Sequence, residues 1–564
     1  MSGSLLPPFA PFLIAALLAL VVPGRFRPML LLLAPVGGAI NLWALSEGGG
    51  LETELMGYRL ELFRADSLSF LFGILFHIAA FLGGLFAFKI QDRLQVASAL
   101  VYVASALGFV FAGDFITLFI AFEGMTIAST GLVLARRTPM ATSVSLRYFG
   151  VQAGAGLLFL AGALLLIEET GSSHFGQIGL DSLGGILIFV AFGIKCGFPG
   201  VHTWLTEAYP VSTPTGAVFL SAFTTKAAVY ALARGFPGEE PLIYIGTAMA
   251  VFPIFYAVIE NDLRRVLCYS MINQLGFMVV GIGLGTTLAL NGAVAHAFAD
   301  VLFKGLLLMT MGAVLHQTGK INGSELGGLY RSMPLTTGLC IVGAASISAF
   351  PLFSGFVTKS MIMAAAAEQG YSVVWYLLLF ASAGVFHHAG IKIPFFAFFA
   401  HDSGLRPRDP SWNMLGAMAL GAGLCLAIGI HPAPLYALLP YPVDYLPYTL
   451  PHVIAQLQLL FFSALAFAWL KMTGLYPPEL RSIIIDADWL LRRAVLPGVR
   501  GFAGIMIRLA AGAERAGERP ARGLLSQIFR VHGPEGVFGR TWLTGNTVLW
   551  IAALLGLYLI IYYT

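Results

Sequence analysis

The chain has 564 residues, of which 58% are hydrophobic and 11% are charged, and its mean hydropathy is +0.83. Soluble domains carry about 25% charged residues, so this composition excludes an ordinary soluble protein and indicates a polytopic helical membrane protein. No phosphate-binding glycine motif is present, so we expect neither a bound nucleotide nor a nucleic-acid partner.

Apolar runs of about 20 residues, the length of helix that crosses a bilayer, follow one another along most of the chain. No run of alternating polar and apolar residues bounded by turns stands out, so neither strands nor an outer-membrane barrel are expected. The first run has no basic start and no small-residue cleavage site, and we interpret it as a span rather than a signal peptide. The sixteen predicted helices lie near residues 5–22, 28–45, 66–88, 95–112, 114–134, 144–167, 182–203, 213–233, 242–259, 266–284, 287–315, 336–366, 373–400, 412–430, 452–472 and 546–562.

Two of the predicted helices contain a proline in or beside the apolar stretch, Pro199 in the range 182–203 and Pro351 in the range 336–366. A helix that is broken inside a membrane survives only where protein or water satisfies the freed backbone groups. Both ranges are therefore predicted to be broken helices.

Charges in the loops predict an orientation. The first, third and fifth loops are basic and contain Arg25, Lys89 and Arg136, whereas the second and sixth loops are acidic. Because basic loops stay in the cytoplasm, the N-terminus is expected on the outer side. We predict a multi-pass protein of the bacterial cytoplasmic (inner) membrane.

Residues 479–543 differ from the rest of the chain. They contain ten arginines and six acidic residues, so their charge equals the net charge of +4 of the whole chain. The pattern predicts a basic amphipathic helical segment on the cytoplasmic membrane surface, interrupted at Pro497 and Pro520. It fits two roles, an anchor on anionic lipid headgroups or a strap across neighbouring helices or subunits.

Charged residues recur inside the apolar runs. Glu123 lies nine positions after Asp114, which places it about 13 Å deeper along the helix. Lys195 and Lys226 lie in two later apolar runs, near residues 182–203 and 213–233. A charged group in the middle of a membrane usually lines a hydrated path and has a partner. We therefore predict that Glu123 pairs with one of these lysines, and that making and breaking the pair gates proton transfer; a permanent ion pair that only holds helices together is the alternative.

His296, Asp300 and Lys304 recur at four-residue intervals, which places them on one stripe of one helix. Imidazole, carboxylate and ammonium groups in register are able to relay a proton through intervening water. Lys359 follows Pro351 by eight residues and is predicted to face a half-channel.

Two further groups are secondary candidates. His387, His388 and Lys392 cluster near a helix end, where the lysine could instead extend to the membrane surface. His202 and Glu207 follow Pro199 and are predicted to form a polar cap or gate. The four cysteines are far apart in apolar runs without metal-binding spacing, so no cofactor and no metal are expected.

These residues lie in runs that resemble the proton-conducting antiporter-like subunit superfamily, which includes the membrane-arm subunits of complex I and the large subunits of Mrp-type cation/proton antiporters. The resemblance covers about residues 66–400 and is nearest to the D-type large subunits of Mrp antiporters from proteobacteria. It rests on AGDFITLFIAFEGMTIAS, FVAFGIKCGFPGVHTWLTEAYPVSTPTGAVFLSAFTTKAAVYALAR, ENDLRRVLCYSMINQLGFMVVGIG and FPLFSGFVTK.

The resemblance implies an all-α membrane fold of about 14 core helices, with two inverted five-helix repeats that each contain a broken helix. It implies that Glu123 pairs with Lys195, that Lys226 is a connecting lysine, and that Lys359 is the terminal lysine. In the family a histidine usually stands where this chain has Asp300. The implied division is N-terminal helices (1–65), two antiporter-like halves (66–235 and 236–400), C-terminal helices (401–478), the basic segment (479–543) and a final anchor (544–564).

Three functions fit these features. The first is a proton-translocating subunit of a multi-subunit monovalent cation/proton antiporter, with membrane lipid, other membrane subunits, protons and a monovalent cation as its partners. The second is a proton-pumping arm of a complex I-like redox enzyme or hydrogenase, and the third an energising subunit for bicarbonate uptake. In each case the chain is expected to be a transporter subunit rather than an enzyme by itself.

Overall fold

The computed structural model describes residues 6–45, 50–55, 58–480, 484–490, 493, 496–536, 539 and 544–563. Parts of the predicted basic segment 479–543, and residue 5 of the first predicted helix, lie outside the described residues. The chain divides into two compact units, Met1–Ile484 and Ile485–Thr564.

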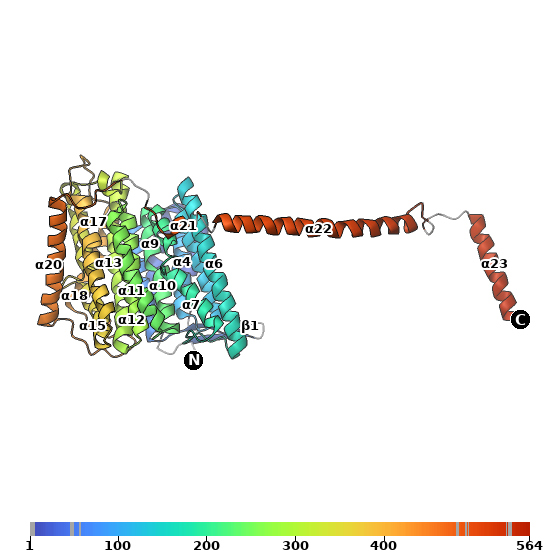
Figure 1. Cartoon of the computed structure of the whole chain (residues 1–564), viewed down its shortest axis with the longest axis horizontal. Coiled ribbons are helices and arrows are strands. Elements are labelled where there is room, and N and C mark those ends of the chain that lie inside the picture. The colour runs from blue at the N-terminus through green and yellow to red at the C-terminus, as the bar shows by residue number, and fades with distance from the viewer. Residues whose placement is uncertain are drawn as a thin grey trace. The chain divides into compact units, whose positions relative to one another are not determined.

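Helices run side by side through the first unit and share a large buried apolar core (Figure 1). In the part of the chain that the structure describes, thirteen helices are long and apolar enough to cross a membrane, and three shorter apolar helices accompany them. Each of the sixteen overlaps one of the predicted ranges, which confirms the helical membrane fold class.

The helices of the first unit fall into two stretches of the chain. The first stretch contains α1 (Ala10–Val21), α2 (Arg27–Ala44), α3 (Ser67–Phe86), α4 (Arg93–Phe111), α5 (Phe115–Leu134), α6 (Pro139–Thr170), α7 (Leu183–Cys196), α8 (Thr203–Val211), α9 (Pro214–Ala222) and α10 (Thr224–Gly235). The second contains α11 (Glu240–Ile259), α12 (Leu263–Leu284), α13 (Thr287–Thr318), α14 (Pro334–Ile347), α15 (Ser354–Glu368), α16 (Ser372–Val385), η4 (Phe386–Ile391), α17 (Lys392–Pro394), η5 (Phe395–Phe399), α18 (Trp412–Ile430), α19 (Ala433–Tyr436) and α20 (Leu450–Met472), and short 3-10 turns lie at Gly24–Phe26, Gly323–Glu325 and Leu329–Arg331.

Acidic and hydroxyl side chains fix many of the helix starts. Asp114 accepts hydrogen bonds from the backbone N–H groups of Ile116 and Thr117, both at 2.8 Å. Asp66 and Ser69 form a reciprocal capping box at the start of α3. Such caps satisfy N–H groups that the first helical turn leaves free. The cap at Asp114 thereby sets where α5, and with it Glu123, begins its path.

Both predicted breaks are present. α7 ends at Gly197, which adopts a left-handed φ of 84°, and the chain resumes as α8 after Pro199. The second break separates α14 from α15 and contains two non-glycine residues with positive φ, Ala349 (55°) and Leu352 (75°). A side chain in that conformation costs about 1–3 kcal/mol and persists where the surroundings impose it.

Two interruptions were not predicted. The range 213–233 was expected to be one helix, but it divides at Phe223 into α9 and α10. The range 373–400 was expected to be regular, but it contains two π-helical segments, η4 and η5, on either side of Lys392. The interruption at Phe223 has no proline or glycine at its centre, so the sequence lacked the usual signal there. In the second interruption Gly390 lies within η4 and Pro394 directly precedes η5, so a signal was present and was not used.

The expectation of no strands was wrong for the loop between α2 and α3. β1 (Gly50–Leu55) and β2 (Tyr58–Arg64) pair antiparallel with an irregular register after Leu51. The hairpin lies at the same end of the first unit as the N-terminus (Figure 1). Leu60 and Phe63 of β2 are buried, so half-burial of a short hairpin stabilises it although each strand is too brief to give a clear alternating pattern.

The second unit contains α21 (Ala487–Leu490), α22 (Leu496–His532) and α23 (Thr544–Tyr563). The predicted interruptions of α22 are absent. Pro497 lies in its first turn, where the missing N–H has no helical partner anyway, and the helix continues past Pro520 because one lost bond in 37 residues is carried by the neighbouring turns. Exposed apolar residues, including Phe502, Met506 and Leu509, recur at three- and four-residue spacing.

Candidate ion-conducting axis

Buried charged side chains extend through the first unit from α5 to the π-helical segments. Seven of the eight predicted pathway residues are at most 3% exposed, and Glu123 is half-buried. A charge in such surroundings is costly unless it is paired or hydrogen-bonded, so the partners of each group define the site. The seven buried residues are Lys195, Lys226, His296, Asp300, Lys304, Lys359 and Lys392.

Lys195 ends α7 and points toward α5. Its Nζ donates to Thr126 Oγ1 at 3.2 Å and to the Phe122 carbonyl at 3.4 Å, and it lies 3.8 Å from the centroid of the Phe122 ring. Glu123 and Lys195, both described, form no ion pair within 4.0 Å. The Glu123 carboxylate lies instead against α6, where a Cβ on Gly156 would collide with it. The predicted pair is therefore open in this structure.

A hydrogen bond from an indole group bridges the first helix break. Trp204 Nε1 donates to the Ile194 carbonyl at 2.9 Å, within the last turn of α7. This bond joins the two sides of the break. It satisfies backbone that the interruption exposes, as a broken helix in a membrane requires.

The predicted cap residues border this break. The ring of His202 lies 4.8 Å from that of Phe252 on α11, and its side chain is buried. Glu207 of α8 pairs with Arg147 of α6 at 3.3 Å. The two side chains thus attach α8 to α11 and α6, on either side of the break.

Lys226 and Asp300 form a fully buried ion pair. Nζ of Lys226 lies 2.6 Å from Oδ2 of Asp300, and both side chains are 0% exposed. Lys226 also donates to the Ser221 carbonyl at 3.3 Å, just before the interruption between α9 and α10. Oδ1 of Asp300 makes no hydrogen bond with the described residues. The pair joins α10 to α13.

The other members of the predicted stripe have different partners. Lys304 donates to Ser270 Oγ at 2.9 Å. Asp300 lies one turn before Lys304 on α13 and is therefore adjacent to two lysines, one on its own helix and one across the interface. The predicted stripe on α13 therefore does not form one line of relay groups. Its members instead contact two different helices, α10 and α12.

His296 is held between α12 and α15. Its Nε2 lies 2.9 Å from Gln274 Oε1 and its Nδ1 lies 3.0 Å from Thr358 Oγ1. The amide of Gln274 donates to Asn273, whose own amide donates to the Ala250 carbonyl. This order leaves Gln274 Oε1 as an acceptor, so Nε2 of His296 carries a proton. The Thr358 hydroxyl accommodates either state of Nδ1, because it lies close enough to the Ser354 carbonyl to donate there instead.

Lys359 follows Thr358 directly and faces the second helix break. Its Nζ donates to the Ile347 carbonyl at 3.3 Å and lies 4.8 Å from the centroid of the Phe277 ring. In an unbroken helix the N–H four residues after Ile347 would bond this carbonyl, but that residue is Pro351, which has none. The lysine occupies the place of the missing donor.

One of the two predicted possibilities was that the Lys392 side chain extends outward, but it is enclosed by protein instead. Its side chain is 0% exposed and its Nζ lies 3.0 Å from Oε1 of Glu479. It also donates to the carbonyls of Val258 at 2.7 Å and Glu260 at 2.6 Å, at the end of α11. The end of a helix leaves such carbonyls without partners, and they hold the lysine inside.

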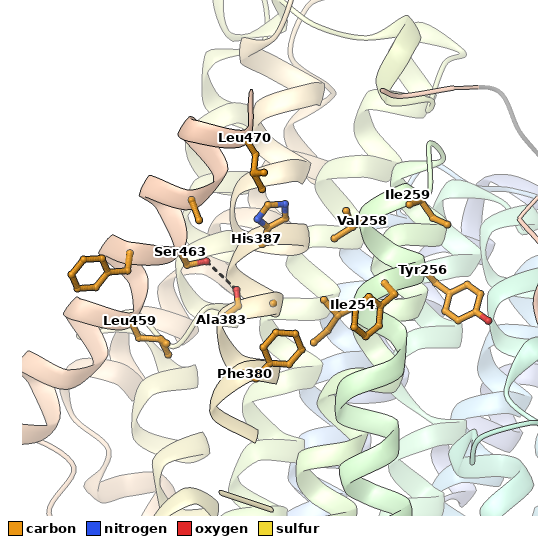
Figure 2. A pocket seen from close by; sticks show the side chains of 14 residues that line it. Ile254, Tyr256, Val258, Ile259, Phe380, Ala383, His387, Leu459, Ser463 and Leu470 are labelled. Atoms are coloured by element: carbon orange, nitrogen blue, oxygen red, sulfur yellow. Dashed lines mark hydrogen bonds between the residues drawn. The ribbon is translucent and has the colours of Figure 1, made fainter. Parts of the chain in front are cut away.

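His387 and His388 have different surroundings. His387 stacks on Tyr476 and lines an apolar cavity of about 770 Å³ between α11, α16 and α20 (Figure 2). His388 is fully buried one turn before Lys392. Only His388 is therefore enclosed with the charged axis.

Several partners were not predicted from the sequence. Ser270 and Gln274 are one turn apart on α12, inside the run ENDLRRVLCYSMINQLGFMVVGIG, and polar residues at four-residue spacing in an apolar helix were an available signal. Thr126 and Thr358 each lie next to a predicted residue in space. Glu479 follows α20 in a proline-containing loop and carried no signal.

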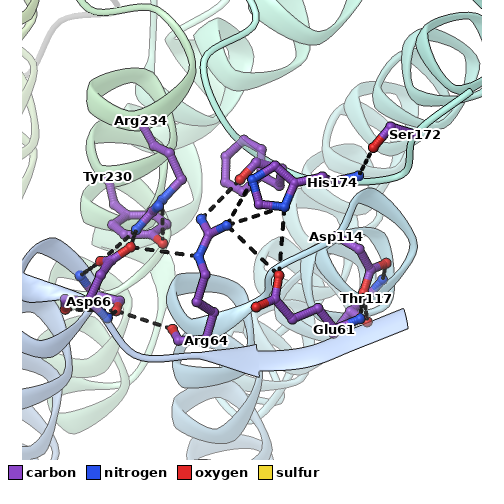
Figure 3. A network of polar contacts seen from close by, with 11 residues as sticks. Glu61, Arg64, Asp66, Asp114, Thr117, Ser172, His174, Tyr230 and Arg234 are labelled. Carbon is purple, nitrogen blue, oxygen red and sulfur yellow. Dashed lines mark hydrogen bonds and ion pairs between the residues drawn. The ribbon is translucent and has the colours of Figure 1, made fainter. Parts of the chain in front are cut away.

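A network of polar contacts covers the hairpin end of the unit (Figure 3). Arg234, at the end of α10, donates to both oxygens of Asp66, at 2.8 and 2.7 Å. Arg64 lies 3.7 Å from Asp66 and 3.8 Å from Glu61. Burial raises the pKa of Asp66, but Arg234 and the Ser69 N–H outweigh this effect and the pKa lies below its usual value. The network attaches the hairpin to the helix that carries Lys226.

Comparison with known proteins agrees with this arrangement. The family described as "NADH:quinone oxidoreductase/Mrp antiporter, TM" matches residues 112–386. The matched residues make up slightly less than half of the chain. The match includes the first break, the Lys226–Asp300 pair and the second break, which together form the centre of the axis.

Relatives with this transmembrane module occur in different complexes. The chain is 26% identical over 288 residues to hydrogenase-4 component B of Escherichia coli, covering 46% of this chain and 43% of that protein. It is 29% identical over 314 residues to the D subunit of a Na(+)/H(+) antiporter of Alkalihalophilus pseudofirmus, covering 51% and 64%. The chain thus aligns with less than two thirds of the length of each.

Two solved structures share the fold. A chain of the Mrp complex from Dietzia sp. superposes with a TM-score of 0.76 at 24% identity, covering 92% of this chain and 62% of that one. A chain of an archaeal membrane-bound sulfane sulfur reductase superposes with a TM-score of 0.71 at 21% identity, covering 98% and 99%. Both structures are multi-subunit membrane complexes.

The hairpin-end network gives a prediction for pH. Because the pKa of Asp66 is lowered by folding, its stabilising contribution is present above the usual aspartate value of 3.8 and is lost as the pH falls through the folded value. Asp66→Asn should therefore lower the midpoint of thermal unfolding of the purified protein at pH 7. The difference from the unsubstituted protein should narrow toward and below pH 3.8, and a constant difference across this range would contradict the ion-pair explanation.

Proposed function

We propose that this chain is the proton-translocating subunit of a multi-subunit Mrp-type monovalent cation/proton antiporter. The family match over residues 112–386, the similarity to the D subunit of an antiporter and the fold of an Mrp complex chain support this proposal. The observation that carries it is the series of buried lysines from α7 to α17. The hydrogen bonds and ion pairs that hold each lysine are able to break when a proton is transferred or a carboxylate moves.

The first module is the Glu123–Lys195 pair. In the open state, a hydroxyl, a carbonyl and an aromatic face solvate the ammonium of Lys195. Movement of the half-buried carboxylate of Glu123 toward it would stabilise the charged lysine, and movement away would favour release of its proton. The glycine at position 156 makes room for the carboxylate in its position away from Lys195.

The second module is the Lys226–Asp300 pair. Of the two residues, Asp300 stands where the family usually has a histidine. Asp300 is able to exchange one lysine for the other, because Lys226 lies across the interface and Lys304 lies one turn along α13. An exchange would leave Lys226 with only the Ser221 carbonyl and promote its deprotonation. Proton transfer is thereby coupled to the position of one carboxylate.

The remaining pathway residues are proposed to continue the axis. His296 connects this centre to Lys359 through Thr358, and Lys392 ends the axis near α11. His202, Glu207 and His387 are proposed to border the path rather than carry protons. We further propose a bacterial inner-membrane location, an outer N-terminus and a cytoplasmic basic segment, with lipid and other membrane subunits as partners and a monovalent cation exchanged.

A proton-pumping arm of a redox complex is the second candidate. Two observations favour it: the similarity to hydrogenase-4 component B and the nearly complete overlap with a chain of a respiratory sulfur reductase. Energising bicarbonate uptake is a third candidate without an observation of its own. Purification from the native membrane separates them, since small antiporter-like subunits, iron–sulfur subunits or a carbonic-anhydrase-like protein would accompany the chain respectively.

The test of the proposed function uses inverted membrane vesicles that contain the complete complex. Glu123→Gln or Lys195→Ala should reduce cation-induced proton movement to the background of vesicles without the complex, because each removes one half of the first module. Lys320→Ala, which changes an exposed lysine outside the axis, is the matched control. Unchanged transport in both pathway variants, with normal amounts of protein in the membrane, would refute proton translocation through this module.

The second module gives a separate prediction. Asp300→Asn should lower transport about 100-fold or more, the scale of losing a proton-transfer group, whereas Asp300→Glu should retain part of it because the charge is kept. Thermal unfolding of both variants in detergent shows whether the fold is intact. Equal transport by the asparagine and glutamate variants would show that the charge of Asp300 is not used.

A further inference from the structure

Glu479 lies near the surface of the first unit and contacts a fully buried ammonium group. Its side chain is 7% exposed and lies 3.0 Å from Nζ of Lys392. The residues on either side of it in the chain, Pro478 and Leu480, are exposed. Both oxygens of the carboxylate are themselves buried, so the carboxylate lies directly beneath this surface and next to the buried axis.

The location of Glu479 corresponds to one end of the membrane-spanning unit. Lys392 bonds the last carbonyls of α11, and Glu260, which ends that helix, lies 3.6 Å from Arg265 at the start of α12. Continuing the count of loops puts Arg265 on the same side as Arg25, Lys89 and Arg136 of the basic loops. Glu479 thus lies on the basic-loop side, the side that the charge rule assigns to the cytoplasm.

Aromatic contacts hold the loop that carries Glu479. Tyr476 stacks on His387 with ring centroids 5.5 Å apart and meets Phe467 edge-on at 5.1 Å. Lys471 Nζ lies 5.6 Å from the centroid of the Tyr476 ring. The loop is fixed three residues before Glu479, so the carboxylate is held over Lys392 by packing as well as by charge.

A route inward from Lys392 is available. His388 lies one turn earlier on the same interrupted helix and is fully buried. Its ring nitrogens make no hydrogen bond of normal geometry with the described residues, although the Gly384 carbonyl is nearby. The π-helical segments η4 and η5 flank Lys392, and such segments occur often at functional sites because they shift side chains out of helical register.

From this arrangement we propose that Glu479 and Lys392 form the mouth of a proton entry on the basic-loop side, joined to the central lysines through His388. This inference rests on the proposed function. Glu479 takes a proton from water and becomes neutral, which releases its hold on Lys392. The Lys392 ammonium gives a proton to a ring nitrogen of His388, and Glu479 returns its proton to the lysine. One proton has then moved inward, and His388 passes it to a neutral Lys304.

The environment of Glu479 suits this role. Burial raises the pKa of its carboxyl group above the ordinary glutamate value, and Lys392 opposes this effect only in part. Uptake of a proton is thereby easier than at an exposed glutamate. A carboxylate that served only as a fixed counter-ion would gain nothing from such surroundings.

The experiment uses the complete complex in inverted vesicles. Glu479→Gln should lower cation-induced proton movement about tenfold or more, since it removes a proton-transfer group, and Glu479→Asp should keep part of it. Glu368→Gln, at an exposed position in the same half of the chain, is the matched control. Full transport by Glu479→Gln would overturn the proposal.

A double variant separates conduction from support. Replacing a buried ion pair by uncharged residues of similar size is often neutral for stability, so Lys392→Met/Glu479→Gln should unfold at about the same temperature as the unsubstituted protein. If the pair conducts protons, transport of the double variant stays low. If transport recovers, the pair is only structural and the proposal fails. Loss of transport in Glu123→Gln together with full transport in Glu479→Gln would reject this entry and leave the proposed function standing.

Discussion

An ammonium group that is buried in a membrane protein needs hydrogen-bond acceptors, and in this protein the interrupted helices supply them. Lys359 bonds the carbonyl of Ile347, which Pro351 cannot serve. Lys226 bonds Ser221 just before a second interruption, and Lys392 bonds the carbonyls that the end of α11 leaves free. The helix breaks and these buried lysines therefore satisfy each other's hydrogen-bonding groups. The carbonyls of a regular helix are already bonded within the helix, whereas an interruption leaves carbonyls that a lysine, or at the first break the Trp204 indole, satisfies.

Neighbouring carboxylates then influence the protonation of the buried lysines. Four of these lysines have an acidic neighbour, but the distances differ. The pair of Glu123 and Lys195 is open, whereas Asp300 and Glu479 are in direct contact with Lys226 and Lys392. Lys304 lies one turn from Asp300 on the same helix. Because a buried pair gains little net stability over apolar residues, these contacts are better explained by control of protonation than by support of the fold. One structure therefore contains one open pair and two closed pairs.

Much of this arrangement was predictable and some was not. Prolines marked two of the breaks, and the lysines stood out because charged residues are rare in apolar runs. The contact between Lys226 and Asp300 was not predictable from the regular spacing around Asp300, since that spacing describes one helix and the contact crosses to another. Glu479 was missed for a related reason: an acidic residue in a loop is ordinary until the fold brings it over a buried lysine. The hairpin depends on tertiary packing that short sequence windows do not contain.

The place of Glu479 along the chain has a consequence for how the protein can be shortened. Every membrane helix of the first unit is complete by Met472, so a version that ended soon afterwards would look intact as a bundle. It would nevertheless lack the acid that neutralises Lys392, and a buried positive charge would be left with carbonyl dipoles alone. Trimming this tail therefore means redesigning position 392 at the same time.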